Sequence, residues 1–332
     1  MNEPLLSEYQ ALIGREGPAT TTAVERGAVT RFAEAVGDPI VLGDDGEPSV
    51  PPTFLASLPY QRPRLPAGGD DHLINAENTF TFVRAPIVGE AITTTAAFTR
   101  VARRGPLVRL GLEVRYAGAG GAPIGAVTVL FVIDHDGVCA EGLGDAHRGR
   151  PAPALAEPPF VPHGVARPRS DPAAVRAWAA VDLASLGPND ALPPLAKAPL
   201  TTLQFVQYAG ASGDFNPIHY DGRAASKAGL PDVVAPGLLK MAFFAQHMAL
   251  CAGRTAHLRR LEARYVGFDV PGQELTSRAV VRGATVTGDG HRTLEIDLSL
   301  QDRHGEAATV GGATLEIPGD GEAGSARAPG AR

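Results

Sequence analysis

The stretch Tyr208-Ala-Gly-Ala-Ser-Gly-Asp214 has a counterpart earlier in the chain, Phe32-Ala-Glu-Ala-Val-Gly-Asp38, at an offset of 176 residues. Two further blocks match in the same order: residues 50–55 (VPPTFL) with 234–239 (VAPGLL), and residues 84–93 (RAPIVGEAIT) with 268–276 (FDVPGQELT). In the last block Gly89 falls on Gly272. Matches that keep their order at a similar spacing indicate two copies of one structural unit. The second copy carries eight extra residues just after its Gly-Asp pair.

Each copy is predicted to contain a helix followed by several strands. In the second copy residues 236–251 are apolar nearly all round, which predicts a buried helix that Pro236 starts and Gly253 ends. Runs rich in β-forming residues, separated by turn residues, then predict strands at 258–266, 274–287, 293–301 and 309–317. The first copy has similar runs at 78–83, 91–101, 108–116 and 126–134. A central helix with an antiparallel sheet around it is an α+β unit.

The segment between the two copies is rich in proline, with seven prolines in the 22 residues 151–172. Proline removes a backbone donor and restricts φ, so an extended linker is predicted at 151–175. The expected domains are therefore 1–150 and 176–318. Residues 319–332 have little to bury and are predicted to form a disordered tail.

Composition excludes several classes of protein. Hydrophobic residues make up 44% of the chain and charged residues 20%, which is enough for a folded core. A net charge of −6 without a basic block argues against a nucleic-acid partner. The two cysteines, Cys139 and Cys251, form neither a disulfide framework nor a zinc pattern. The N-terminus lacks the features of a signal peptide and no apolar run approaches 18 residues, so we expect a cytoplasmic protein without a membrane span.

The most informative chemical pattern is Gly213-Asp-Phe-Asn-Pro-Ile-His219. Gly213 allows close approach of the backbone, and the Asn216-Pro217 pair favours a turn that directs Asp214, Asn216 and His219 to one side. A carboxylate and an imidazole held in this way can share one water, each serving as acid or base in turn. Such a pair requires neither a cofactor nor a metal, and no third metal ligand follows at regular spacing.

This run resembles the signature of the MaoC-like hydratases, also called (R)-specific enoyl thioester hydratases or hydratase 2. The resemblance extends over residues 200–318, and the first half resembles the degenerate N-terminal domain of the same family. It implies a double hot-dog fold, in which a long helix in each repeat is wrapped by an antiparallel sheet. It also implies reversible hydration of a trans-2-enoyl thioester to the (R)-3-hydroxyacyl thioester, with coenzyme A or acyl carrier protein as the carrier. A homodimer or a heteromeric partner subunit remains open.

By the same resemblance, Asp214 and His219 match the catalytic dyad, and Asn216 matches a supporting residue, with Gly213 and Ser212 beside it. The backbone N–H of Gly237 matches the donor to the thioester carbonyl. A helix N-terminus suits this role, since it offers unpaired N–H groups to a developing oxyanion. The chain departs from the family in one visible place: Pro236 stands where many members have histidine.

The first half is expected to be catalytically silent, because Asp38 is followed by Pro39-Ile40-Val41 and lacks the histidine. Thr53 stands where Gly237 stands. We expect residues 51–58, in particular Thr53 and Ala56, to line the acyl pocket.

Two alternatives are a hot-dog thioesterase and a non-catalytic partner subunit of a dehydratase. A thioesterase requires a carboxylate near the central helix, and residues 237–251 contain none. His247, on the apolar helix, is interpreted as a packed core histidine, whereas His72, His257, His291 and His304 are interpreted as solvated.

Overall fold

The structure is a computed structural model that describes residues 3–38, 46–66, 73–105, 107–133, 181–253, 255–287 and 290–319. Within these ranges ten strands form a single antiparallel sheet in the order β1-β3-β4-β5-β2-β7-β10-β9-β8-β6. The strands are β1 (Thr20–Ala23), β2 (Leu73–Phe82), β3 (Ala91–Arg104), β4 (Leu107–Ala117), β5 (Pro123–Ile133), β6 (Leu195–Ala196), β7 (His257–Tyr265), β8 (Thr276–Val286), β9 (Arg292–Gln301) and β10 (Ala307–Ile317). The helices are α1 (Glu3–Gln10), α2 (Arg26–Val36), α5 (Thr202–Ser212), α6 (Gly222–Lys227) and α7 (Gly237–Ala252), with 3₁₀ turns η1 (Pro52–Ser57), η3 (Ala119–Gly121) and η4 (Pro217–His219).

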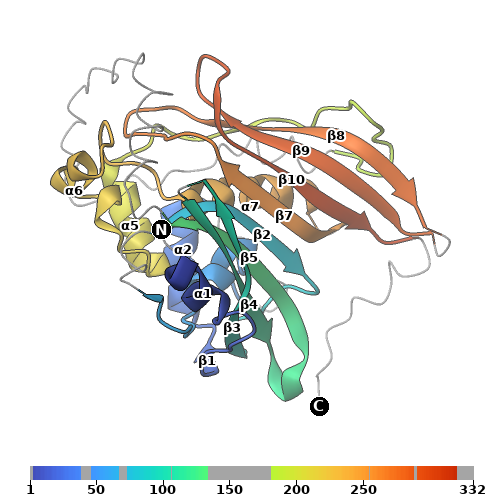
Figure 1. The fold of residues 1–332 in the computed structure, drawn as a ribbon. Helices are drawn as coiled ribbons and strands as arrows, with labels where there is room; N and C mark the ends of the chain where they lie inside the picture. Colours follow the sequence, from blue (N-terminus) through green and yellow to red (C-terminus); the bar gives the residue numbers. More distant parts are fainter. Residues whose placement is uncertain are drawn as a thin grey trace.

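The two halves of the chain supply the two halves of this sheet, which meet where β2 pairs with β7 (Figure 1). The strand order on one side of this seam repeats on the other. Matched glycines adopt matched backbone conformations: φ is 71° at Gly37 and 78° at Gly213, and 85° at Gly89 and 86° at Gly272. The predicted internal repeat, with two copies side by side in one sheet, is therefore confirmed.

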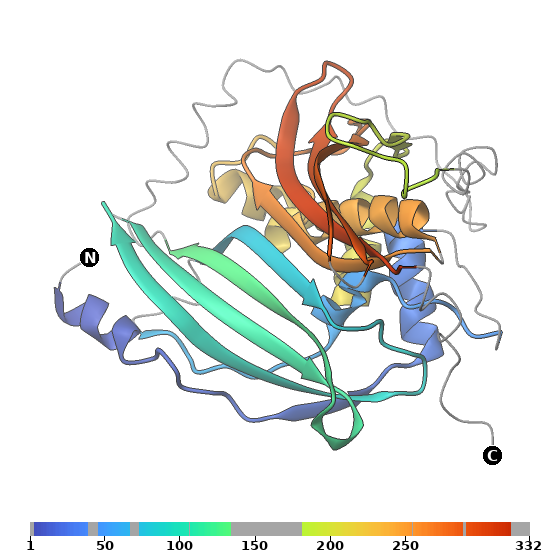
Figure 2. The same ribbon diagram turned by 90° about the vertical axis from the view of Figure 1, so that its right-hand side faces the viewer.

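The buried helix of the second half is α7, close to its predicted bounds, and Gly253 is its C-cap. The sheet curves around this helix (Figure 2). Alternate residues of β9, from Leu294 to Leu300, face inward and are fully or almost fully buried. The period-2 pattern of the strands and the apolar surface of the helix thus meet in one core.

The first half differs from the prediction of a long helix in each repeat. The six-residue 3₁₀ turn η1 stands at the place that corresponds to the start of α7. Pro59, Pro63 and Pro66 follow this turn, and each removes a backbone donor that a longer helix would require. The turn packs against α7, the long helix of the second half.

The helices α2 and α5 pack against each other, and the rings of Phe32 and Tyr208 lie 5.7 Å apart between their centroids. These two residues open the matched blocks of the repeat. Contact between equivalent residues is typical of an approximate two-fold axis.

A buried lysine joins the two halves near this axis. Lys197 Nζ donates to the carbonyl of Val36 (2.9 Å) and to Oε1 of Gln246 (2.5 Å), and Gln246 Nε2 donates to the carbonyl of Gly37 (3.0 Å). The carbonyls of Val36 and Gly37 lie at the C-terminus of α2, where a cation interacts favourably with the helix dipole. Burial raises the pKa of Asp38 to about 6 and lowers that of Lys197 to about 8, and each charge opposes the shift of the other. Asp38 therefore has a lysine neighbour in place of the missing histidine.

The predicted linker at 151–175 and the tail from 320 onward lie outside the described residues, as do Cys139 and His72. The domain limits 1–150 and 176–318 remain a prediction. No helix in the described ranges is long and apolar enough to cross a membrane.

We predict that Lys197→Met destabilises the protein by about 3 kcal/mol, because it leaves buried carbonyl oxygens without their donor and the Asp38 carboxyl without a neighbouring cation. Chemical denaturation measures the loss. Asp38→Asn retains most of these bonds and should leave turnover within a few-fold of the wild type. A large loss of turnover in folded Asp38→Asn would contradict the silent-half interpretation.

Candidate active site

The position of Asp214 follows from the way α5 ends. Gly213 takes the left-handed conformation as C-cap, and its N–H donates to the carbonyl of Ala209 (2.9 Å). Ser212 Oγ donates to the carbonyl of Tyr208 (2.7 Å) and accepts from the N–H of Asp214 (3.2 Å). The Ser-Gly pair thus ends the helix and holds the backbone of Asp214 directly beyond it.

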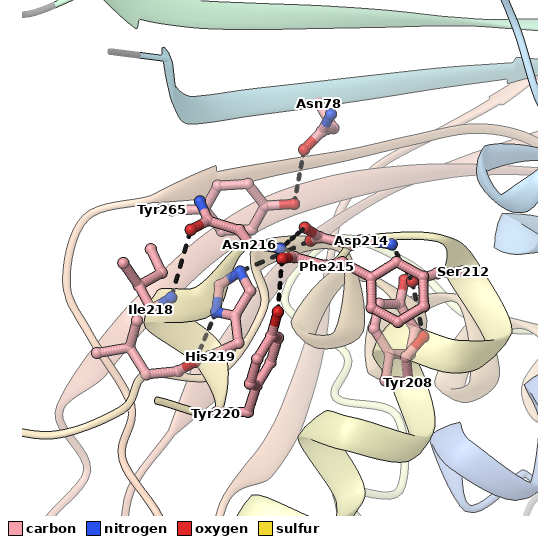
Figure 3. Close-up of polar contacts among 11 residues, drawn as sticks. Asn78, Tyr208, Ser212, Asp214, Phe215, Asn216, Ile218, His219, Tyr220 and Tyr265 are labelled. Carbon is pink, nitrogen blue, oxygen red and sulfur yellow. Dashed lines mark hydrogen bonds and ion pairs between the residues drawn. The ribbon is translucent and has the colours of Figure 1, made fainter. Parts of the chain in front are cut away.

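The turn η4 then brings His219 back toward Asp214. Asn216 is the N-cap of this turn, and its Oδ1 accepts from the N–H of Ile218 (3.3 Å). Pro217 stands at the first position, where its missing donor costs nothing. The exposed Asn216 side chain therefore supports the turn that carries His219, as Figure 3 shows.

Asp214 and His219 face each other in Figure 3, with 3.6 Å between Oδ2 and Nε2. This distance is too long for a direct hydrogen bond. The His219 side chain is 9% exposed and that of Asp214 is 33% exposed, so the pair has a buried side and an open side. The structure thus brings together the two residues that the sequence predicts as a dyad.

A backbone carbonyl determines which ring nitrogen of His219 carries the hydrogen. Its Nδ1 lies 2.8 Å from the carbonyl of Val234, which only accepts, so Nδ1 carries the hydrogen and Nε2 presents a lone pair to Asp214. Burial lowers the pKa of His219; Asp214 and the Val234 carbonyl oppose this shift, and Lys240 adds to it. At neutral pH the pair therefore offers two acceptors, which one water can bridge with its two hydrogens.

The second feature of the site is the start of α7, three residues beyond Val234. The N-cap is Pro236, which has no side-chain cap, and its carbonyl already accepts from Leu239 and Lys240. Among the described residues the N–H groups of Gly237 and Leu238 have no acceptor. An unpaired helix N-terminus of this kind suits a developing negative charge.

Tyr265 covers Gly237. A Cβ at this glycine would lie 2.8 Å from the Tyr265 ring, so only glycine fits without a shift. The Tyr265 hydroxyl donates to Oδ1 of Asn78 (2.7 Å), which is fully buried in β2 of the first half. The first half therefore supports the site from across the β2–β7 seam (Figure 3).

Tyrosines surround the carboxylate of Asp214. Burial raises the pKa of Tyr208 and Tyr265, and the charge of Asp214 adds to both shifts. Burial also raises the pKa of Tyr60, from the first half; Arg62 opposes this shift and Asp214 adds to it. The sequence contained no signal for Asn78 or Tyr60, because neither belongs to a motif, and only the pairing of the two halves brings them near.

Other predicted residues have clear places in the fold. His247 is fully buried, its Nε2 donates to the carbonyl of Pro193 (2.8 Å), and burial lowers its pKa to about 4, which confirms a packed core histidine. Burial raises the pKa of Cys251 to about 12, so its thiol stays protonated at neutral pH. Thr53 and Ala56 lie in η1 against α7, with Thr53 buried; their role in an acyl pocket remains a prediction.

Comparison with known proteins agrees with this architecture. A model of the MaoC-like domain matches residues 188–300, and a model of the FAS1-like dehydratase domain region matches residues 11–125. The second half of the chain thus contains a MaoC-like domain, and the first half matches a dehydratase region. The MaoC-like match contains Asp214, His219 and Gly237, whereas Asn78 and Tyr60 lie outside it in the first half.

Solved structures support the same fold at low sequence identity. A MaoC-like dehydratase is 20% identical, with coverage of 94% of this chain and 100% of that chain and a TM-score of 0.67. A Mycobacterium tuberculosis protein described as having a double hotdog fold is 14% identical, with coverage of 93% and 98% and a TM-score of 0.59. The peroxisomal multifunctional enzyme type 2 of Drosophila melanogaster is 14% identical, with coverage of 90% of this chain but 48% of that chain and a TM-score of 0.58. No curated protein sequence matches significantly.

For the MaoC-like site we predict that Gly237→Ala lowers both stability and turnover. The new Cβ must displace the Tyr265 ring, and such overpacking costs about 1–3 kcal/mol. Because the displacement occurs at the helix N-terminus, turnover of the folded protein should fall as well, by about 10²-fold or more. Thermal unfolding and turnover below the unfolding temperature separate the two effects. Unchanged turnover in the folded variant would make Gly237 a packing residue only.

Proposed function

We propose that the protein catalyses the reversible addition of water to a trans-2-enoyl thioester, which yields the (R)-3-hydroxyacyl thioester of coenzyme A or acyl carrier protein. The MaoC-like domain supports hydro-lyase activity in general. The observation that carries the finer proposal is the pair of acceptors, Nε2 of His219 and Oδ2 of Asp214, 3.6 Å apart. The configuration of the product rests on the family resemblance.

In the hydration direction, the pair binds one water through its two hydrogens. As the water oxygen forms its bond to the β-carbon, one acceptor takes a proton from it, and the electrons of the double bond move toward the thioester carbonyl. The same pair then returns a proton to the α-carbon. Dehydration runs through these steps in reverse, so no proton is gained or lost overall.

The negative charge that develops on the thioester oxygen requires a donor. The N–H of Gly237 supplies it, with the dipole of the 16-residue helix α7 behind it. Since this donor belongs to a buried helix, it does not have to reorient during the reaction. The low dielectric of the site strengthens its effect on the oxyanion.

The rival functions receive less support. A thioesterase requires a carboxylate at the central helix that can activate water. Helix α7 has no acidic residue, and the Asp269 carboxylate beside it is buried in an ion pair with Lys240. A non-catalytic subunit has no need for a histidine whose tautomer and pKa suit it to accept a proton. We therefore assign the chemistry to this chain.

We predict that Asp214→Asn and His219→Gln each lower kcat by about 10²–10⁴-fold. The double variant should lose little more than either single variant, because both residues act on one water. Loss of enoyl-CoA absorbance measures turnover, circular dichroism verifies the fold, and His304→Gln, in an exposed turn, is the matched control. Near-normal turnover in either single variant would exclude the dyad.

Substitutions in η1 should change the length of acyl chain that the enzyme prefers. We expect Ala56→Leu and Thr53→Ile to lower kcat/KM for long enoyl-CoA substrates, since added bulk against α7 shortens the acyl space. Turnover of the four-carbon substrate serves as the internal control and should change little. Equal loss across all chain lengths would place the acyl group elsewhere.

A further inference from the structure

Lys240, in the apolar helix α7, forms a buried ion pair with a residue outside the helix. The proposed reaction does not use this pair. Lys240 Nζ lies 3.0 Å from Oδ2 of Asp269, and the two side chains are 3% and 4% exposed. Removing two charges from water is expensive, and a hydrophobic pair of the same volume is often as stable or more stable. The pair is therefore poorly explained by stability alone.

The contacts of this pair connect the first turn of α7 to the segment after β7. Lys240 Nζ also donates to the carbonyl of Gly267 (3.2 Å) and lies 5.5 Å from the centroid of the Tyr265 ring. The carbonyl of Asp269 accepts from the N–H of Ala235 (2.8 Å). Side chain and backbone of Asp269 thus hold both ends of residues 235–240.

This segment and Val234, the residue directly before it, carry two groups of the proposed site. The Val234 carbonyl orients His219, and the Val234 N–H donates back to the carbonyl of Ile218 (3.1 Å). Gly237 supplies the oxyanion donor beneath the Tyr265 ring. A displacement of the segment would therefore disturb the base and the oxyanion donor together.

The silent half provides an internal comparison. The offset of 184 that aligns Val50 with Val234 places Ala56 on Lys240, and the match of Gly89 with Gly272 places Pro86 on Asp269. Both charges are thus absent from the copy that lacks the histidine. The ion pair is therefore present only in the copy that has the proposed catalytic pair, and the fold that both copies share does not require it.

We propose that Lys240 and Asp269 are positioning residues that clamp residues 234–237, and so set the geometry of His219 and of the Gly237 amide at once. This inference rests on the proposed function of the site. Neither side chain touches the substrate.

The clamp also places charges near His219. The charged groups that influence it are Asp214, on its own loop, and Lys240 from α7, paired with Asp269 from the segment after β7. Tyr208 on α5 and Tyr265 on β7 stay neutral because burial raises the pKa of each. Removing Lys240 takes away a cation that lowers the pKa of His219, so this pKa should rise. Removing the charge of Asp269 alone leaves a cation, which should lower it.

The experiment compares Lys240→Met, Asp269→Asn, Lys240→Arg and the double variant Lys240→Met/Asp269→Leu. The double variant removes both charges, so it should fold with a melting temperature near or above that of the wild type. Its kcat should nevertheless fall by about 10- to 100-fold, because small displacements of catalytic groups are costly, while KM changes little. Lys240→Arg should recover part of the activity. Lys197→Met, which removes a buried lysine outside the site, should lose stability without losing kcat in the folded state.

The pH profile of kcat/KM provides a second test, because a purely structural role of the ion pair would not shift this profile. The acid limb of kcat/KM should shift to higher pH in Lys240→Met and to lower pH in Asp269→Asn, and NMR titration of His219 should follow the same directions without reference to turnover. Wild-type activity tests the proposed function, whereas the variant-to-wild-type ratios and the NMR titration test the clamp. Normal kcat in the folded double variant would overturn the proposal. So would a shift of the His219 pKa in the same direction in Lys240→Met and Asp269→Asn.

Discussion

The pairing of β2 with β7 is the constraint on which the other features of this protein depend. It joins two copies of one unit into a single sheet and places α2 against α5, so that Phe32 meets Tyr208. It also brings Asn78 of one copy within hydrogen-bond reach of Tyr265 of the other. A site that belongs to the second copy by its motif is thereby supported by both.

The two copies have diverged around this shared frame. The second has the long helix, the extra turn with His219 and the buried Lys240–Asp269 pair; the first has a 3₁₀ turn and an aspartate next to a lysine of the other copy. Unpaired N–H groups at a half-buried helix N-terminus have a free-energy cost that a bound ligand can offset. One such terminus is retained, and the corresponding position of the first copy carries Thr53.

Backbone groups perform much of the positioning in this site. The Val234 carbonyl fixes the tautomer of His219, the Ser212-Gly213 ending of α5 places Asp214, and the first N–H of α7 is the proposed oxyanion donor. Backbone groups on a packed helix and its flanking turns move little, so the acceptors and the donor are organised before substrate arrives. The buried charges and tyrosines around them hold these backbone segments in turn.

The sequence by itself determined the repeat, the strands, the buried helix and the pairing of Asp214 with His219, because these depend on periodicity and on spacing within a few residues. Local steric rules govern such features: glycine at a left-handed position, proline at a helix start and alternation along a strand. Only the tertiary structure decided that a 3₁₀ turn stands in the described first half where the second has α7, that Lys197 neighbours Asp38, that Tyr265 bonds to Asn78, and that Lys240 pairs with Asp269. These contacts join residues up to 187 positions apart, and no local pattern specifies which distant side chain fills a given buried space.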